Sequence, residues 1–293
     1  MTTPPADETF LADDTVALAL PEQPIPAPPP QSLAEKTLDE VDRLWDSLSA
    51  SSAPPASPLD FELPAGFKLS VVIPVYNERG TIREVIARVR ELPLQTEIIV
   101  VDDCSTDGTA EWLRTLEGAP GLRLIFKPVN EGKGAALRAG FAEATGDVVV
   151  VQDADLEYDP RDLPQLLQPI VSGEADVVYG SRFLGEELRD KSWLHRLVNR
   201  VLTGASNLFT GLRLTDMETC YKVFRRQVIQ GLPLHQSRFG FEPEVTARLA
   251  RLGCRVVERP VGYHARGYAE GKKIGVADAF NALYCVVRYS LAD

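Results

Sequence analysis

From residue 68 to residue 181 the sequence alternates short runs of β-branched residues with segments in which apolar residues recur every three or four positions. The runs predict buried strands, and the segments between them predict amphipathic helices. Helices that connect successive strands favour a parallel sheet covered on both faces. The predicted fold class is therefore α/β with a mostly parallel central sheet. We expect strands at 69–75, 97–102, 122–126, 147–152 and 175–179, and helices at 81–92, 109–117, 134–144 and 163–171.

The first 60 residues differ in composition from the rest of the chain. They hold 11 of the 22 prolines, and 11 acidic residues against two basic ones. Such a segment buries too little apolar surface to offset its ordering entropy. We therefore expect a disordered, acidic, proline-rich tail at 1–60 and a single folded domain at 61–293. Within the tail, the capping pair Ser32 and Glu35 and the apolar spacing that follows predict a helix at 32–49, either transient or docked on a protein partner or on the body of the chain itself.

Charge divides the folded part into two halves. Residues 61–181 carry 11 basic and 20 acidic side chains, whereas residues 182–273 carry 17 basic and 9 acidic ones. Carboxylates suit a hard cation, and clustered Lys and Arg suit phosphate. A metal-bound diphosphate is a ligand that both halves together would fit.

The spacing of the cysteines and the length of the apolar runs indicate in which cellular compartment the protein is expected. The four cysteines form no C-x-x-C pair and follow no secretory signal, which predicts reduced thiols in a cytoplasmic protein. No run of 18 apolar residues predicts a membrane span. The most apolar segment, 274–291, is interrupted by Asp278, Asn281 and Arg288. It predicts a helix that packs in the core or lies at a membrane surface.

Acidic and polar residues follow the predicted strands directly. Ligands of open parallel sheets bind at the carboxyl ends of the strands. Asp153 and Asp155 come after four consecutive valines, and alternate side chains in an extended chain point the same way. Two aligned carboxylates suit Mg²⁺ or Mn²⁺, which fill their other positions with water and phosphate oxygens.

Several further segments, in this order and at these intervals, complete a recognisable set. The chain resembles the family 2 glycosyltransferases of the GT-A fold over roughly residues 69–290. Within that family it is most similar to the polyprenyl-phosphate (dolichyl-phosphate) mannose and glucose synthases. The resemblance rests on Val72-Ile-Pro-Val-Tyr-Asn-Glu78, Val100-Val-Asp-Asp-Cys-Ser-Thr-Asp-Gly108, Asp153-Ala-Asp155, Asn130-Glu-Gly-Lys-Gly-Ala-Ala136, Gly180-Ser-Arg182, Asp216-Met-Glu-Thr-Cys-Tyr-Lys222, Phe241-Glu-Pro-Glu244, Arg266 and Glu270-Gly-Lys-Lys273.

The resemblance implies roles for matching residues. Asp155, Arg182 and Arg266 would be catalytic. Glu157, where those synthases often have Gln, would either add a metal ligand to Asp153 and Asp155 or alter specificity. The nucleotide-sugar pocket would be lined by Pro74, Tyr76, Glu78, Asp103, Lys133, Asp153 and Ala154. Phosphates would be bound by Arg182, Lys222, Arg266, Lys272 and Lys273.

The implied function is metal-dependent, inverting transfer of a hexose from a GDP-mannose or UDP-glucose type of donor to a polyprenyl phosphate. It would take place at the inner face of a membrane, without a nucleic-acid partner. A phosphate acceptor is already anionic and needs no general base, whereas a hydroxyl acceptor does. The acceptor therefore decides whether Asp216, Glu218, Glu242 or Glu244 is a base or structural. Transfer to a hydroxyl acceptor and a non-catalytic nucleotide-sugar-binding regulator remain alternatives.

Overall fold

The computed structural model describes residues 59–184, 193–238, 240–265 and 276–291. The strands are β1 (Leu69–Val75), β2 (Thr96–Asp102), β3 (Leu122–Phe126), β4 (Val148–Val151), β5 (Val177–Ser181), β6 (Lys222–Arg225) and β7 (Val256–Pro260). The helices are α2 (Ile82–Arg90), α3 (Thr109–Arg114), α4 (Lys133–Glu143), α5 (Leu163–Val171), α6 (Trp193–Thr210), α7 (Arg226–Gly231), α8 (Phe241–Arg251) and α9 (Val276–Leu291), with a 3-10 turn η1 (Pro160–Asp162) before α5.

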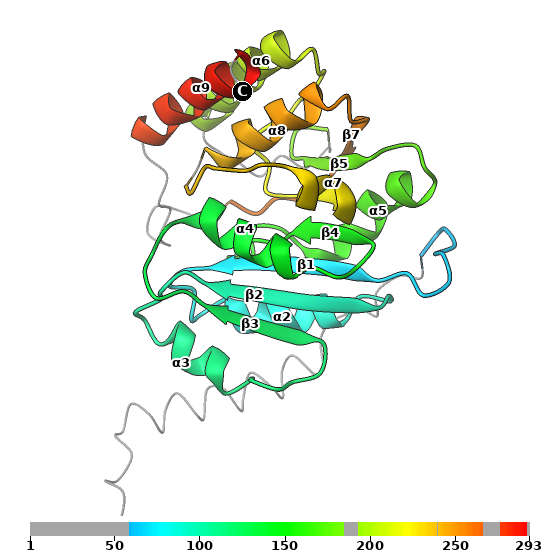
Figure 1. Cartoon of the computed structure of the whole chain (residues 1–293), viewed down its shortest axis with the longest axis vertical. Helices are drawn as coiled ribbons and strands as arrows, with labels where there is room; N and C mark the ends of the chain where they lie inside the picture. Colours follow the sequence, from blue (N-terminus) through cyan, green and yellow to red (C-terminus); the bar gives the residue numbers. More distant parts are fainter. Residues whose placement is uncertain (1–58, 185–192, 239, 266–275, 292–293) are drawn as a thin grey trace, which may run out of the picture. The chain divides into compact units, whose positions relative to one another are not determined.

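The described strands form one seven-stranded sheet in the order β3-β2-β1-β4-β6-β5-β7. β1 pairs in parallel with both β2 and β4, and β5 pairs in parallel with β7. β6 is antiparallel to β4 and to β5. In Figure 1, α4 lies in front of the sheet and α2 behind it, so helices cover both faces. The predicted α/β class with a mostly parallel, helix-covered sheet is confirmed.

Local sequence explains the elements at the centre of the sheet. The four valines of β4 are all buried, because this strand has covered faces on both sides. In α2 the buried residues Ile82, Val85, Ile86 and Val89 follow the helical i, i+3, i+4, i+7 spacing. Gly140 of α4 lets that helix approach β1 closely, since an added Cβ would lie 2.3 Å from a methyl group of Val72.

The predicted elements up to residue 181 agree with the structure to within a few residues at each end, and β1, β3 and α5 have the predicted bounds. Beyond residue 181 the only predicted element is the apolar segment 274–291, most of which lies in α9. The four cysteines are unpaired, two of them buried. Within the described residues, every helix is too short or too polar to cross a bilayer.

Candidate functional site

The ends of β1, β2 and β4 lie at one edge of the sheet, because these strands are parallel neighbours. The chain turns sharply just after each of them. Asn77, Cys104 and Leu156 have positive φ angles of 56°, 66° and 61°. This left-handed backbone is uncommon for residues other than glycine and concentrates at functional sites. The turns set the predicted residues Tyr76, Asp103 and Asp153 near the edge where ligands of such sheets bind.

Asp103 organises the loop that leads into α4. This carboxylate is 3% exposed. It accepts hydrogen bonds from Lys127 Nζ (2.9 Å), Glu131 N (3.1 Å) and Gly132 N (2.6 Å). Nearby, the Oδ1 atom of Asp102 is buried and has no hydrogen-bond partner among the described residues. Asp103 therefore shapes the loop, and its predicted contact with a nucleotide stays a prediction.

The other residues predicted for the nucleotide pocket line the first strand and its turn. Pro74 lies within β1, and Tyr76 is 36% exposed just beyond the end of that strand. Glu78 Oε2 accepts a hydrogen bond from Thr81 Oγ1 at 2.9 Å, at the start of α2. These residues stand at the predicted edge, and their contacts with a donor remain predictions.

Lys133 and Asp153, which are 20 residues apart in sequence, form an ion pair at the centre of the site. The ammonium of Lys133, at the start of α4, lies 2.8 Å from Asp153 Oδ1 and 3.1 Å from Oδ2. Glu242 Oε1 of α8 lies 3.5 Å from the same ammonium. Burial alone would lower the pKa of Lys133, but the charge of Asp153 holds that pKa well above its usual range. Burial alone would raise the pKa of Asp153, but Lys133 lowers it.

A loop at 235–237 holds the start of α4 in place. An added Cβ on Gly132 would lie 2.6 Å from Ser237 O, and one on Gly134 would clash with Gln236 O. Glu244, fully buried in α8, accepts hydrogen bonds from the backbone N–H groups of residues 235 and 236 at 2.9 and 2.7 Å. Glu244 is therefore structural. This contact could not be predicted from local sequence, because the loop and the start of α4 lie about 100 residues apart in the chain.

The oxygen ligands predicted for a metal lie on one loop after β4. Asp155 Oδ1 accepts a hydrogen bond from Glu157 N at 3.1 Å. Glu157 Oε2 accepts one from the hydroxyl of Tyr263 at 2.9 Å. Ala154 between the two aspartates is buried. These hard carboxylate oxygens fit Mg²⁺ or Mn²⁺, although no group of three His, Cys, Asp or Glu side chains able to hold a metal occurs in the described part of the chain.

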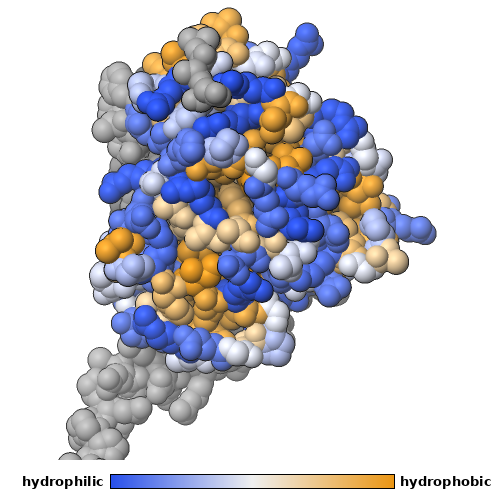
Figure 2. Space-filling view, viewed as in Figure 1, coloured by the Kyte–Doolittle hydropathy of each residue, from blue (hydrophilic) through white to orange (hydrophobic). Residues whose placement is uncertain are grey.

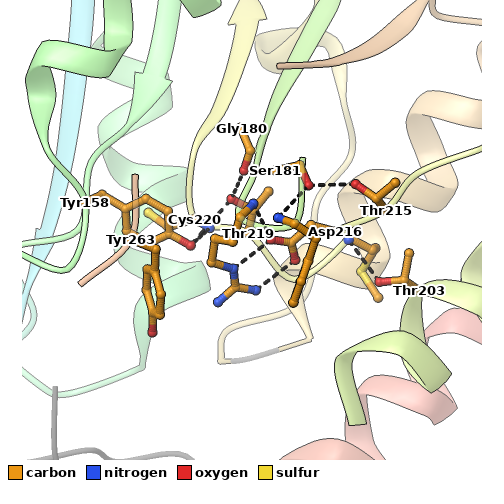
Figure 3. A network of polar contacts seen from close by, with 12 residues as sticks. Tyr158, Gly180, Ser181, Thr203, Thr215, Asp216, Thr219, Cys220 and Tyr263 are labelled. Carbon is orange, nitrogen blue, oxygen red and sulfur yellow. Dashed lines mark hydrogen bonds and ion pairs between the residues drawn. The ribbon is translucent and has the colours of Figure 1, made fainter. Parts of the chain in front are cut away.

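Arg182, at the end of β5, makes a bidentate ion pair with Asp216. Its Nε lies 2.7 Å from Asp216 Oδ2 and its Nη2 lies 2.8 Å from Oδ1. Figure 3 shows Asp216 within a polar network that also joins Ser181 to Thr215, whose hydroxyls are 2.6 Å apart. The guanidinium also lies over the ring of Tyr263, 5.1 Å from its centroid. Asp216 is fully buried, so it fixes the plane of Arg182 rather than standing free as a base.

Lys222 is fully buried in β6. Its ammonium donates to Met217 O at 2.9 Å and also to Thr219 O. These contacts give Lys222 a structural role, and its predicted contact with phosphate stays a prediction. Burial and the neighbouring Glu242 raise the pKa of Glu218 to about 8, so this carboxyl is mostly protonated at neutral pH.

Three predicted phosphate-binding residues, Arg266, Lys272 and Lys273, lie outside the described residues. The tail at 1–60 and its predicted helix at 32–49 also lie outside them, except for the last two residues. The structure brings together Lys133 with Asp153, and Asp155 with Glu157. It also joins Arg182 to Asp216, whose role as a base or as a structural residue the sequence leaves open.

The mostly parallel sheet, with a carboxylate loop after β4 and an arginine after β5, is the arrangement of an α/β fold whose ligand binds at the strand ends. Residues 70–232 match glycosyl transferase family 2, so the chain belongs to that family. The undecaprenyl-phosphate mannosyltransferase of Micrococcus luteus is 31% identical over 77% of this chain and 95% of that protein. The dolichol-phosphate mannosyltransferase of Pyrococcus furiosus is 32% identical over 71% of this chain. The chain spans 60% of the length of that protein and 66% of the length of an undecaprenyl-phosphate 4-deoxy-4-formamido-L-arabinose transferase of Aeromonas hydrophila.

Solved structures share the fold. Glucosyl-3-phosphoglycerate synthase of Mycobacterium tuberculosis, in complex with Mn²⁺, UDP and phosphoglyceric acid, has a TM-score of 0.60 and 26% identity, over 78% of this chain and 80% of that one. The same enzyme with Mg²⁺ and UDP has a TM-score of 0.59 and 28% identity, over 78% and 81%. These likenesses confirm the predicted GT-A fold.

Proposed function

We propose that this protein transfers a hexose from a nucleoside-diphosphate sugar to a polyprenyl phosphate, with inversion at the anomeric carbon. The donor is of the GDP-mannose or UDP-glucose type, and the enzyme acts in the cytoplasm at a membrane surface. A phosphate oxygen of the acceptor forms a bond to the anomeric carbon while the bond from that carbon to the diphosphate oxygen breaks. The nucleoside diphosphate leaves with the electron pair, and no proton has to be removed from the acceptor.

The contacts and the protonation of the four candidate base carboxylates support a phosphate acceptor over a hydroxyl acceptor. Asp216 is committed to Arg182, and Glu244 is committed to the loop at 235–237. Glu218 is mostly protonated at neutral pH, because burial and Glu242 raise its pKa to about 8. Only the minor ionised fraction of Glu218 could accept the proton of a hydroxyl. Of the four carboxylates, Glu242 has its Oε1 facing Lys133. The names of the relatives in Micrococcus and Pyrococcus support the same acceptor class.

The residues of this chain would stabilise negative charge on the leaving diphosphate. Asp155 and Glu157 would hold Mg²⁺ or Mn²⁺, which supplies a Lewis acid for that charge when it is bound. Asp153 would hold Lys133 at the nucleotide site through their ion pair. Arg182, whose plane Asp216 fixes, would contribute a preorganised cation. Arg266, Lys272 and Lys273 would bind the acceptor phosphate.

The test is a donor panel with the purified full-length chain. GDP-mannose, UDP-glucose and related nucleotide sugars are incubated with a short polyprenyl phosphate, with Mg²⁺, Mn²⁺ or a chelator, and the released nucleotide is measured. We expect release from one donor class only, dependent on both the metal and the acceptor. Nucleotide binding without release under any of these conditions would favour the regulator.

A further inference from the structure

Helix α6 turns a polar stripe inward and an apolar stripe outward. Asn199, Thr203 and Ser206 are buried, and the backbone N–H of Met217 donates to Thr203 Oγ1 at 3.1 Å. On the opposite side, apolar residues repeat at spacings of four, three and four. Water-soluble helices normally show the reverse arrangement. The outward stripe consists of Leu197, Val201, Gly204 and Leu208, and Leu208 is 80% exposed.

Helix α9 extends this apolar surface. It packs against α6 and α8, and Figure 1 draws α6 and α9 side by side. Its residues Leu283, Tyr284 and Val287 are exposed. Eight of the twelve large apolar side chains that are exposed among the described residues lie on α6 and α9. Figure 2 shows hydrophobic surface at the top of the view, where Figure 1 places these helices. We call the outward surfaces of the two helices the α6–α9 face.

Basic residues outnumber acidic ones around the α6–α9 face, since Asp278, near the start of α9, is the one acidic residue in the sequences of the two helices. The sequence has no Asp or Glu at 193–215 or at 281–291, although the whole chain has a net charge of −11. Arg196, Arg200 and Arg213 are exposed on or just after α6. Arg288 of α9 donates to the hydroxyl of Tyr284 at 2.9 Å. Apolar side chains bordered by arginines and a tyrosine are the composition of a surface that lies in the headgroup region of a bilayer.

We propose that the α6–α9 face docks on a bilayer surface that carries anionic phospholipid headgroups. A second copy of the chain in a symmetric pair would bring the exposed arginines of one face toward those of the other. Anionic headgroups complement this charge instead. The proposal names the membrane contact of the proposed function, and it rests on observations outside the candidate site.

The α6–α9 face is also connected to the candidate site. The Tyr289 hydroxyl of α9 accepts a hydrogen bond from Gln236 Nε2 at 2.9 Å. Gln236 belongs to the loop that abuts Gly134 at the start of α4, next to Lys133. A chain docked through α9 would therefore hold the nucleotide side of the site close to the bilayer.

Co-sedimentation with vesicles tests the proposal. The full-length chain is mixed with vesicles of phosphatidylcholine alone, or of phosphatidylcholine with phosphatidylglycerol, without donor or polyprenyl phosphate. We expect sedimentation with the anionic vesicles only, weakened by salt. The Val201→Glu, Leu208→Glu double variant should bind at least about tenfold more weakly, because it places charges in the apolar stripe. Leu252→Glu, at a residue that is 63% exposed beyond the end of α8, is the matched control and should bind as the wild type does.

Three results would overturn the proposal. The first is that the wild type does not bind anionic vesicles. The second is that the double variant and Leu252→Glu lose vesicle binding equally. The third is that the wild type is a dimer and the double variant is a monomer. Transfer to a short polyprenyl phosphate in detergent separates this proposal from the proposed function. The double variant should keep that activity. If the wild type binds vesicles but transfers a sugar to no acceptor, the proposed membrane docking stands and the proposed function is refuted.

Discussion

The Asp216→Asn variant distinguishes a structural carboxylate from a catalytic base. Asp216 is fully buried and accepts hydrogen bonds from Arg182 Nε, Nη2 and backbone N at 2.7, 2.8 and 3.1 Å. Asparagine has nearly the same shape, but it removes the negative charge and turns an N–H group toward the guanidinium. Arg182, whose side chain is only 17% exposed, would then lack its counter-ion.

The loss of stability follows from that burial. Breaking a buried ion pair by removing one partner costs about 3–5 kcal/mol. We expect urea denaturation of Asp216→Asn to show a decrease of this size in the free energy of unfolding. Asp176 provides the matched control, since it accepts the same three contacts from Arg255 at 3.0, 2.8 and 3.0 Å. That pair lies at the surface, so Asp176→Asn should decrease the free energy of unfolding by only a small fraction of this amount.

Two outcomes would refute this reasoning. Equal losses of stability in Asp216→Asn and Asp176→Asn would show that burial does not set the strength of the pair. A variant Asp216→Asn with wild-type stability and wild-type affinity for free nucleotide, but without transfer, would make Asp216 a base and favour a hydroxyl acceptor.

Four further predictions concern the metal, a buried proton, the acceptor and the tail. Asp155→Asn should abolish nucleotide release with an unchanged melting temperature, because it removes a ligand charge at constant volume; full activity would remove the metal assignment. Since the pKa of Glu218 rises from 4.5 to about 8 on folding, the folded state holds an extra proton between these values. Stability should therefore decrease as pH rises from about 4.5 to 8, and Glu218→Gln should flatten this decrease in denaturation experiments at several pH values; an unchanged profile would argue against the raised pKa. Arg266→Ala should raise the apparent KM for polyprenyl phosphate more than the Kd for free nucleotide, and the reverse would place Arg266 at the donor. Removal of residues 1–60 should change the melting temperature and the transfer rate little, whereas a large drop in melting temperature would show that this segment packs on the rest of the chain.

The first half of the fold could be predicted because its local signals agree with its packing. The valines of β4 have no polar alternation, and such a run is stable only inside a covered sheet. Asp153 and Asp155 follow that run, so the parallel strand rule placed them at the ligand edge. Only the family resemblance implies that the loop with Lys133 lies near these aspartates. The structure shows the ion pair between Lys133 and Asp153 that joins them.

The second half could not be predicted from local pattern. β6 begins with Lys222, and a lysine normally indicates a surface position, yet backbone carbonyls satisfy its buried ammonium. The pair of Arg182 and Asp216 joins residues 34 positions apart. Neither spacing nor periodicity encodes such contacts. The apolar outward stripe of α6 also has the period of a core helix, so periodicity alone does not give the direction in which it faces.

The acceptor assay tests the central claim most directly. Purified wild-type chain is given its donor, metal and either a polyprenyl phosphate or the polyprenol of the same chain length, and the sugar recovered in the lipid product is measured. Our account predicts transfer to the phosphate alone, with inverted anomeric configuration. Transfer to the polyprenol or to a soluble hydroxyl acceptor, with none to the phosphate, would contradict it.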